Sequence, residues 1–324
     1  MGLGNFSLSA AFAVGLAALI PVATAAQVRD MGAIQQQGFL GRTVAPDEFK
    51  VFHDSEFKGA HKVAISVFNV AFPDENHFTA PSSGRPGLFS RSGPVLRTTL
   101  SGVDTATRQR ITNKAYALFV RQLTAAGYEV VDQAELARLA PEFATWTSLP
   151  NYSQGKYGTY VVPTGQSLRF LPGDASKRDT TTNAFAANNQ AIAVSLGTQA
   201  FKRSPYIAHD GNLGIIAVNI VVDYGVYSNG HGRASFQPGV TIAAGDVVDR
   251  GTMIEYWGTR SGGFPAYAFL QQPILRADRD YRASQSGSDT DIDIVADPAK
   301  FEAAADEVMR VAAPKLVAVM AASR

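Results

Sequence analysis

Three aspartates at alternate positions, Asp289, Asp291 and Asp293, form the densest acidic feature of the chain. Carboxylate oxygens are the ligands that Ca²⁺ prefers, and this spacing resembles the start of a calcium-binding loop. The rest of that pattern is missing, because Ile294 stands where a glycine is required and Lys300 where a bidentate glutamate is required. On a strand, alternate residues share one face. A solvated strand face is therefore the favoured interpretation, and a bound Ca²⁺ is the alternative.

A second candidate for chemistry combines His209 and Asp210, in the segment AHDGN, with His231 in SNGHG. A histidine beside an aspartate could share a cation or support hydrolysis, so a periplasmic hydrolase or metal-assisted enzyme is one alternative function. The same residue types are typical of turns and hairpin tips. The chain has no Gly-x-Ser-x-Gly pattern, no His-Glu-x-x-His pattern and no cysteine. We therefore assign no catalytic residue and regard the three side chains as candidate contacts for a ligand or partner.

Aromatic residues cluster in Thr145–Phe170, a segment that glycines and prolines otherwise mark as loops. Because binding residues are often carried by loops, Trp146, Tyr152, Tyr157 and Tyr160 are further candidate contacts for a ligand or partner. A carrier of an apolar ligand, with a pocket lined by such rings, is another alternative function.

Charge and composition exclude some classes of partner. The chain carries 29 Lys and Arg against 28 Asp and Glu, a formal net charge of +1. Nucleic-acid binders draw much of their affinity from an excess of basic residues, so no nucleic-acid partner is expected. A content of 46% hydrophobic and 18% charged residues is typical of a folded globular protein. The absence of cysteine excludes disulfide bonds and a lipid-bearing N-terminal cysteine.

The N-terminal residues 1–25 predict a secretory signal peptide. An apolar run over 8–22 precedes Ala23, Thr24 and Ala25, a small-x-small pattern that signal peptidase accepts. A membrane anchor is the alternative, although the run is shorter than the ~20 residues that a membrane-spanning helix needs. We expect cleavage after Ala25 and no transmembrane helix in the mature chain. The protein is then expected in the periplasm, secreted, or on the surface of a bacterium.

Two apolar segments predict central strands. In Lys62–Phe72, strict alternation places Val63, Ile65 and Val67 on one face of the strand. The opposite face of this strand then carries Ala64, Phe68, Val70 and Phe72. In 212–228, alternation likewise separates two sets. One set is Ile216, Val218, Ile220 and Val222, and the other is Ile215, Ala217, Asn219, Val221 and Asp223.

The segment between these strands predicts two helices. Apolar residues recur at steps of three and four over Asp104–Ala126, which predicts an amphipathic helix that Gly127 ends. Tyr128–Val131 then predicts a short strand. Asp132, with Glu135 three residues later, predicts a capping-box-like start of a second, short helix. We interpret this pair of carboxylates as a helix cap.

Basic side chains of the first predicted helix form another candidate contact surface. Arg108, Arg110 and Lys114 could face an anionic partner. At steps of three and four residues, however, basic side chains more often form a solvated helix face.

The remaining segments set the predicted organisation. A Pro-, Gly- and Ser-rich stretch at 75–94 predicts a loop, and 191–201, 239–258 and 267–275 predict further strands. A last helix is expected to start at Asp297. The fold class is therefore predicted as α/β (α+β), a mixed β-sheet with packed amphipathic helices, extra strands and a C-terminal helix. The chain is expected to divide into a signal peptide (1–25), an N-terminal arm (26–61), an α/β core with long inserted loops (62–281), and an acidic strand or loop with the C-terminal helix (282–324).

The strand–helix–strand–helix order resembles that of the curli-secretion (CsgG-like) and TolB N-terminal group of bacterial envelope proteins. The matching residues are Val63, Ala64, Ile65 and Phe68, then Gly127, Tyr128, Val130, Val131, Asp132 and Leu136. The resemblance covers roughly 80 residues and implies an anticodon-binding-like core. It implies an exported, non-enzymatic assembly, scaffold or binding module. Its partners would be other envelope proteins or further copies of the chain.

Overall fold

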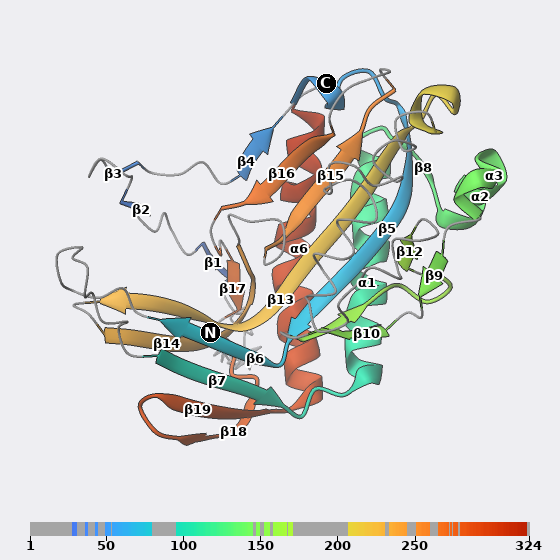
Figure 1. The fold of residues 1–324 in the computed structure, drawn as a ribbon. Coiled ribbons are helices and arrows are strands. Elements are labelled where there is room, and N and C mark those ends of the chain that lie inside the picture. Colours follow the sequence, from blue (N-terminus) through green and yellow to red (C-terminus); the bar gives the residue numbers. More distant parts are fainter. Residues whose placement is uncertain are drawn as a thin grey trace, which may run out of the picture.

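A computed structural model provides the structure of the 324-residue chain (Figure 1). The residues that it describes are 28–30, 36–37, 43–44, 49–52, 54–79, 95–144, 147–149, 152–155, 158–166, 168–170, 207–230, 233–244, 251–259, 265–271, 273, 275–277 and 279–322. Two mixed β-sheets with packed helices make up the described fold, which confirms the predicted α/β class.

The larger sheet has 11 strands, organised around β5 (Lys62–Pro73) and β13 (Gly214–Gly230). Its other strands are β1 (Val28–Asp30), β4 (Phe49–Phe52), β8 (Glu129–Val131), β10 (Tyr152–Gly155), β11 (Gly158–Val161), β14 (Arg233–Ile242), β15 (Met253–Trp257), β16 (Ala266–Leu270) and β17 (Leu275–Ala277). β5 and β13 run parallel to each other. The second edge of β5 pairs with β8 and β11, and the second edge of β13 pairs with β15 and β14.

The predicted N-terminal arm, 26–61, contributes two strands at the ends of this sheet. β1 pairs with β17, and β4 pairs with β16. A short 3₁₀-helix, η1 (Asp54–Phe57), then leads into β5. β1 and β4 of the predicted arm therefore belong to the same sheet as the core.

The smaller sheet has four strands. Their spatial order is β18 (Arg282–Gly287), β19 (Asp291–Ala296), β7 (Val95–Ser101) and β6 (Glu75–Thr79). β19 and β7 are parallel, and the two outer pairs are antiparallel. β6 lies within the predicted loop 75–94, so that part of the loop prediction is wrong. Two separate two-stranded pairs are β2 (Gln36–Gln37) with β3 (Thr43–Val44), and β9 (Thr147–Leu149) with β12 (Leu168–Phe170).

Helices cover the larger sheet. They are α1 (Thr105–Ala125), α2 (Gln133–Leu139), α3 (Pro141–Ala144) and α6 (Pro298–Ala321). α1 and α6 lie side by side against one face of the sheet, where their apolar stripes join the largest hydrophobic cluster (Figure 1). The opposite face meets α2 and α3 in a second, smaller cluster. Among the described residues, no helix is long and apolar enough to span a membrane.

Capping residues set the helix boundaries as predicted. The side chain of Asp104 accepts the N–H of Thr107, and Gly127 follows α1 with φ of 83°. At the second helix, Asp132 accepts the N–H of Glu135 at 2.8 Å. Asp297 caps α6 in the same way. Each cap satisfies backbone N–H groups that have no partner inside the helix.

A bulge in β5 makes one predicted face assignment wrong. Ile65 lies opposite Ile216 but Val67 lies opposite Ala217, so Ser66 is an extra residue in β5. The bulge shifts the alternation, and Val67 packs on the face of Ala64 while Val63, Ile65, Phe68, Val70 and Phe72 share the face of α1 and α6. The extra residue is held by hydrogen bonds, because the Ser66 hydroxyl donates to Ile216 O at 3.0 Å and Gln133 Nε2 donates to Ser66 O at 2.6 Å. In β13 the predicted faces are confirmed.

Other predicted strands are partly confirmed. The segment 239–258 overlaps β14 and contains β15, and 267–275 overlaps β16 and touches β17. The strand predicted at 191–201 lies outside the described residues. The boundary predicted at 282 lies within a closely packed region, because β19 pairs with β7 and α6 packs against α1.

Candidate functional site

The predicted His–Asp site lies at the surface. His209 and Asp210 are exposed in a helical turn at 207–210, and His209 Nδ1 lies 3.1 Å from Asp210 Oδ1. Asn212, two residues later, has a positive φ of 46°, as the predicted turn requires. His231 lies outside the described residues. Within the described part of the chain, no third catalytic or metal-binding group joins the His–Asp pair.

The four aromatic candidates have different environments. Trp146 and Tyr157 lie outside the described residues, and Tyr152 belongs to β10. Tyr160 is only 5% exposed and belongs to a small apolar cluster with Val221, Met253 and Phe269, among others. Tyr160 is therefore a core residue of the larger sheet.

The three aspartates flank an exposed hairpin. Asp291 and Asp293 lie on the exposed face of β19, whose alternate residues Ile294 and Ala296 are buried. Asp289 precedes β19 in the turn after β18. The hydroxyl of Thr99 on β7 donates to Asp293 Oδ1 at 2.5 Å. Nowhere in the described residues do three His, Cys, Asp or Glu side chains come together in a way that could hold a metal ion.

The exposed face of the smaller sheet continues this charged pattern onto β7 and β6. Arg97 lies opposite Asp291 on one side and opposite His77 on the other. Glu75 Oε1 lies 2.5 Å from His77 Nε2 and 2.9 Å from Arg97 Nε. The three neighbouring strands β6, β7 and β19 therefore present a ladder of opposite charges to solvent.

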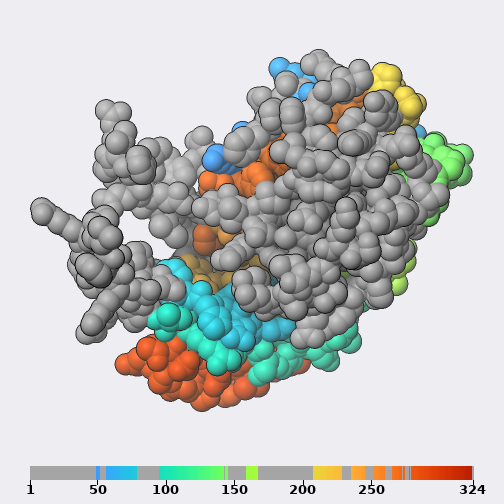
Figure 2. Space-filling model, viewed as in Figure 1, coloured from blue at the N-terminus to red at the C-terminus, as the bar shows by residue number. Residues whose placement is uncertain are grey.

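Among the described strands, β18 is the edge strand beside this ladder. It pairs with β19 on one side, and residues Ala283–Gly287 are all exposed. None of these five side chains is charged. Figure 2 shows β18 and β19, in orange-red, on the lower rim of the molecule next to β6 and β7. Proteins usually protect such edges with charges, prolines or covering segments.

The inner side of β6 and β7 meets a projecting hairpin of the larger sheet. Beyond Val222, β13 pairs with β14 alone, so Gly225–Gly230 and Arg233–Pro238 form a two-stranded arm (Figure 1). We call the contact between this arm and β6–β7 the hairpin junction. Its residues are Asn76, Phe78, Thr98, Asp223, Tyr224, Tyr227, Phe236 and Tyr281.

Aromatic rings form the apolar part of the hairpin junction. Phe78 stacks on Tyr227 with ring centroids 5.6 Å apart, and Tyr227 packs against Phe236 at 5.1 Å. The hydroxyls of Tyr224 and Tyr227 both hydrogen-bond to Thr98 Oγ1, the former at 2.8 Å. The hydroxyl of Tyr281 donates to the carbonyl of Tyr224. The rings exclude water while their hydroxyls satisfy one another and Thr98.

A buried carboxyl group lies at the centre of the hairpin junction. Asp223 is 9% exposed, and Asn76 Nδ2 donates to its two oxygens at 3.1 and 3.3 Å. The backbone N–H of Tyr224 donates to Asp223 Oδ1 at 2.7 Å. Burial raises the pKa of Asp223 to about 7, although these hydrogen bonds act to lower it. Burial also raises the pKa of Tyr224, Tyr227 and Tyr281, so their hydroxyls stay protonated.

A second buried carboxyl group lies on β15. Glu255 is fully buried on the sheet face away from α1 and α6, opposite Ala217 on β13 and Tyr267 on β16. Trp257 Nε1 donates to Glu255 Oε1 at 2.6 Å, whereas Oε2 has no hydrogen-bond partner among the described residues. Burial raises the pKa of Glu255 well above its ordinary value. The group therefore favours its neutral form.

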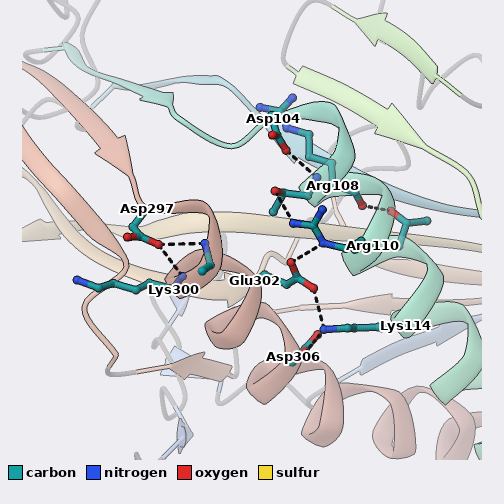
Figure 3. A network of polar contacts seen from close by, with 11 residues as sticks. Asp104, Arg108, Arg110, Lys114, Asp297, Lys300, Glu302 and Asp306 are labelled. Atoms are coloured by element: carbon teal, nitrogen blue, oxygen red, sulfur yellow. Dashed lines mark hydrogen bonds and ion pairs between the residues drawn. The ribbon is translucent and has the colours of Figure 1, made fainter.

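The basic residues of α1 bind acidic residues of the same chain. Arg110 and Lys114 pair with Glu302 at 2.8 Å each, and Lys114 also pairs with Asp306 at 2.7 Å (Figure 3). Hydrogen bonds from Lys114 to Asp306 and Glu302 raise the pKa of the lysine. Arg108 is buried and donates to Asp74 and to Thr159 Oγ1, the latter at 2.6 Å. These residues join α1 to α6 and to the sheet, so the predicted solvated face is wrong for Arg108.

Sequence patterns did not identify the hairpin junction, although one signal was present. Alternation placed Asp223 in line with Val221 in an otherwise apolar strand, and a carboxyl group there needs a specific partner. The partner, Asn76, comes from a segment predicted to be a loop. Family models, curated proteins and solved structures give no match to this chain.

Proposed function

We propose that this protein is an exported, non-enzymatic binding module of the bacterial cell envelope that holds a partner protein in an assembly or scaffold. The observation that carries the proposal is the edge of β18 on the smaller sheet, which no other described strand covers and which is uncharged over Ala283–Gly287. Export is supported by the signal-peptide pattern at 1–25. The partner would add an extended segment to β18 as a fifth strand.

The backbone of β18 is oriented for such an addition. Ser288 N donates to Asp291 O at 2.7 Å at the closed end of the β18–β19 hairpin. In an antiparallel pair, residues that bond to the neighbouring strand alternate with residues that do not. Counting back from Ser288, Ser286 and Ser284 face β19, and the N–H of Gln285 faces the free edge. A partner strand could accept that hydrogen bond without any rearrangement of the sheet.

The adjacent charged ladder supports a protein partner with its own charges. Asp291, Asp293 and Arg97 lie on the exposed face next to the β18 edge. An added strand would place its alternate side chains beside Ser284 and Ser286, in line with these charges. Main-chain hydrogen bonds would then supply affinity, and the charges would favour one register. The partner proposed is an extended segment of another envelope protein.

Site-specific photo-cross-linking in the producing cells tests the proposal. A photoreactive residue at Ser284, on the edge, should capture a single envelope protein, identified by mass spectrometry and then shown to bind in purified form. The matched control is the same residue at Ala134, an exposed position on α2. Gln285→Pro should abolish capture, because it removes the outward N–H while retaining the bonds to β19.

Three outcomes would contradict the proposal. Equal capture from Ala134 and Ser284 would show that the partner does not bind specifically at the β18 edge. Capture that survives Gln285→Pro in a folded variant would exclude strand addition. A cross-linked dimer of this chain would replace the proposed partner with a second copy.

A further inference from the structure

The hairpin junction holds two hairpins together through few polar contacts. On the side of β6–β7 these contacts come from Asn76 and Thr98, which lie directly opposite each other. On the side of the arm they come from Asp223, Tyr224 and Tyr227. The junction therefore depends on a small number of groups, of which one, Asp223, can change its charge near neutral pH.

β6 is the element that can separate most easily. Within the described part of the chain, it is the terminal strand of the smaller sheet and pairs only with β7. Asp223, in contrast, lies where β13 still pairs with Thr241 of β14. If the junction parts, β6 moves away and the larger sheet remains intact, because fewer hydrogen bonds oppose that movement.

In the part of the chain that the structure describes, no cationic side chain contributes to the pKa of Asp223. Among the described residues, the groups that face it are Asn76 from β6, the N–H groups of Tyr224 and Gly225, and the phenol groups of Tyr224, Tyr227 and Tyr281. Thr98 of β7 contributes two uncharged groups to the junction, its hydroxyl and its backbone carbonyl, which accepts from the Tyr224 hydroxyl at 3.0 Å. Glu75 and His77 lie on the opposite, exposed face of β6. A charge on Asp223 would therefore gain most by reaching water.

We propose that the hairpin junction is a proton-controlled latch, in which protonated Asp223 keeps β6–β7 against the arm and loss of its proton to solvent releases β6. The proposal goes beyond strand addition at β18 and does not depend on it. In the closed junction the pKa of Asp223 is raised to about 7. In the open, hydrated state we expect the ordinary value of about 4. The closed state is then most favoured below about pH 4, and the preference is lost as the pH rises to about 7.

Hydrogen exchange of the full chain, followed by mass spectrometry between about pH 4 and pH 8 and corrected for intrinsic rates, tests the latch. In peptides that cover β6, the opening constant should rise by up to about tenfold per pH unit between about pH 4 and 7, and then level off. Asp223→Asn keeps an acceptor for Tyr224 N but cannot ionise. In this variant the opening constant should not change with pH.

Three further variants separate the latch from other causes. Asp210→Asn makes the same chemical change at an exposed aspartate and should behave as the unmodified chain does. His77→Gln removes the imidazole from the outer face of β6, where it contacts Glu75, and should keep the pH dependence. Thr98→Val removes the hydroxyl contacts, so it should raise opening equally at every pH.

The result that would overturn the latch is a pH-independent opening constant for β6 in the unmodified chain, or the same rise in Asp223→Asn. Loss of the rise in His77→Gln would assign it to the histidine instead. If Asp223→Asn does not fold, Asn76→Ala provides the test. Removal of this donor should move the levelling point to higher pH, because the Asn76 hydrogen bond lowers the pKa of Asp223. If the pH at which the opening constant levels off does not change, the proposal is contradicted.

Discussion

Two carboxyl groups, Asp223 and Glu255, are buried among the residues that the structure describes, and their surroundings differ. Glu255 lies within the larger sheet, with strands on both sides, and its Oε2 has no partner in the described part of the chain. Asp223 lies between two sheets, and its hydrogen bonds include one from a terminal strand. Both groups resist ionisation because burial removes them from water. Local opening around Glu255 would have to break strand pairs on both sides of β15, whereas the proposed latch opens by moving the terminal strand β6.

Glu255→Gln should have the largest effect on global stability. The amide retains an acceptor for Trp257 Nε1 and removes the cost of keeping an acid neutral. Because the pKa is raised in the folded state, the original chain loses stability as the pH rises above about 4.5, by up to about 1.4 kcal/mol per pH unit. Urea unfolding at about pH 5 and about pH 8 should show the variant gaining stability over the original chain between the two. If the two proteins differ equally in stability at both pH values, folding does not raise the pKa of Glu255, and the prediction is wrong.

Asp223→Asn should have a smaller and more local effect. The original chain should lose up to about 1.4 kcal/mol per pH unit between about pH 4 and 7, and the variant should not. Part of that loss is avoided if the hairpin junction opens before the fold does, so the global effect should be below that of Glu255→Gln. The same urea series measures both. If Asp223→Asn has the larger effect on global stability, the hairpin junction does not open before the rest of the fold.

Trp257→Phe tests the single hydrogen bond to Glu255. The substitution keeps an aromatic ring but removes the Nε1 donor, so neither oxygen of the carboxyl group would keep the partner seen in the structure. We expect a loss of about 1–3 kcal/mol in the free energy of unfolding. Trp257→Phe combined with Glu255→Gln should recover little of this loss, because the amide also lacks the donor. Thermal unfolding of the two variants and their combination provides the measurement.

Glu302→Gln should have the smallest effect. Glu302 pairs with Arg110 and Lys114, whose side chains are about half exposed. Exposed ion pairs contribute about 0.2–1 kcal/mol each and are screened by salt. Urea unfolding should detect this loss at low salt, and it should shrink at high salt. A loss above that range that does not change with salt would show that the ion pairs of Glu302 contribute to stability as buried groups do.

Local sequence determined the parts of the fold that depend on neighbouring residues. Asp104, Asp132 and Asp297 start helices as predicted, because a cap needs only a side chain and backbone N–H groups a few residues away. The faces of β13 also follow from alternation. In β5 the same reasoning failed after Ser66, because the bulge is held by Gln133 and Ile216, which are distant in the chain.

The candidate sites show the same division. Alternation predicted that Asp289, Asp291 and Asp293 share an exposed strand face. β19 confirms this for Asp291 and Asp293, whereas Asp289 lies in the turn before the strand. The free edge of β18 could not be predicted, because strand order is set by pairing between segments far apart in sequence. The hairpin junction was missed for the same reason, since β6 lies in a segment with the composition of a loop.

The sequence by itself determined the α/β class, the helix caps, the apolar faces of β13 and the neutral overall charge, all of which follow from residue type and short-range spacing. Only the tertiary structure decided which carboxyl groups are buried and lose their hydration. Asp223 and Asp291 are the same amino acid on two strands, yet one is buried against Asn76 and the other faces solvent. The reason is that the pKa of a carboxyl group is set by burial and by nearby donors, which only the packing of distant segments supplies.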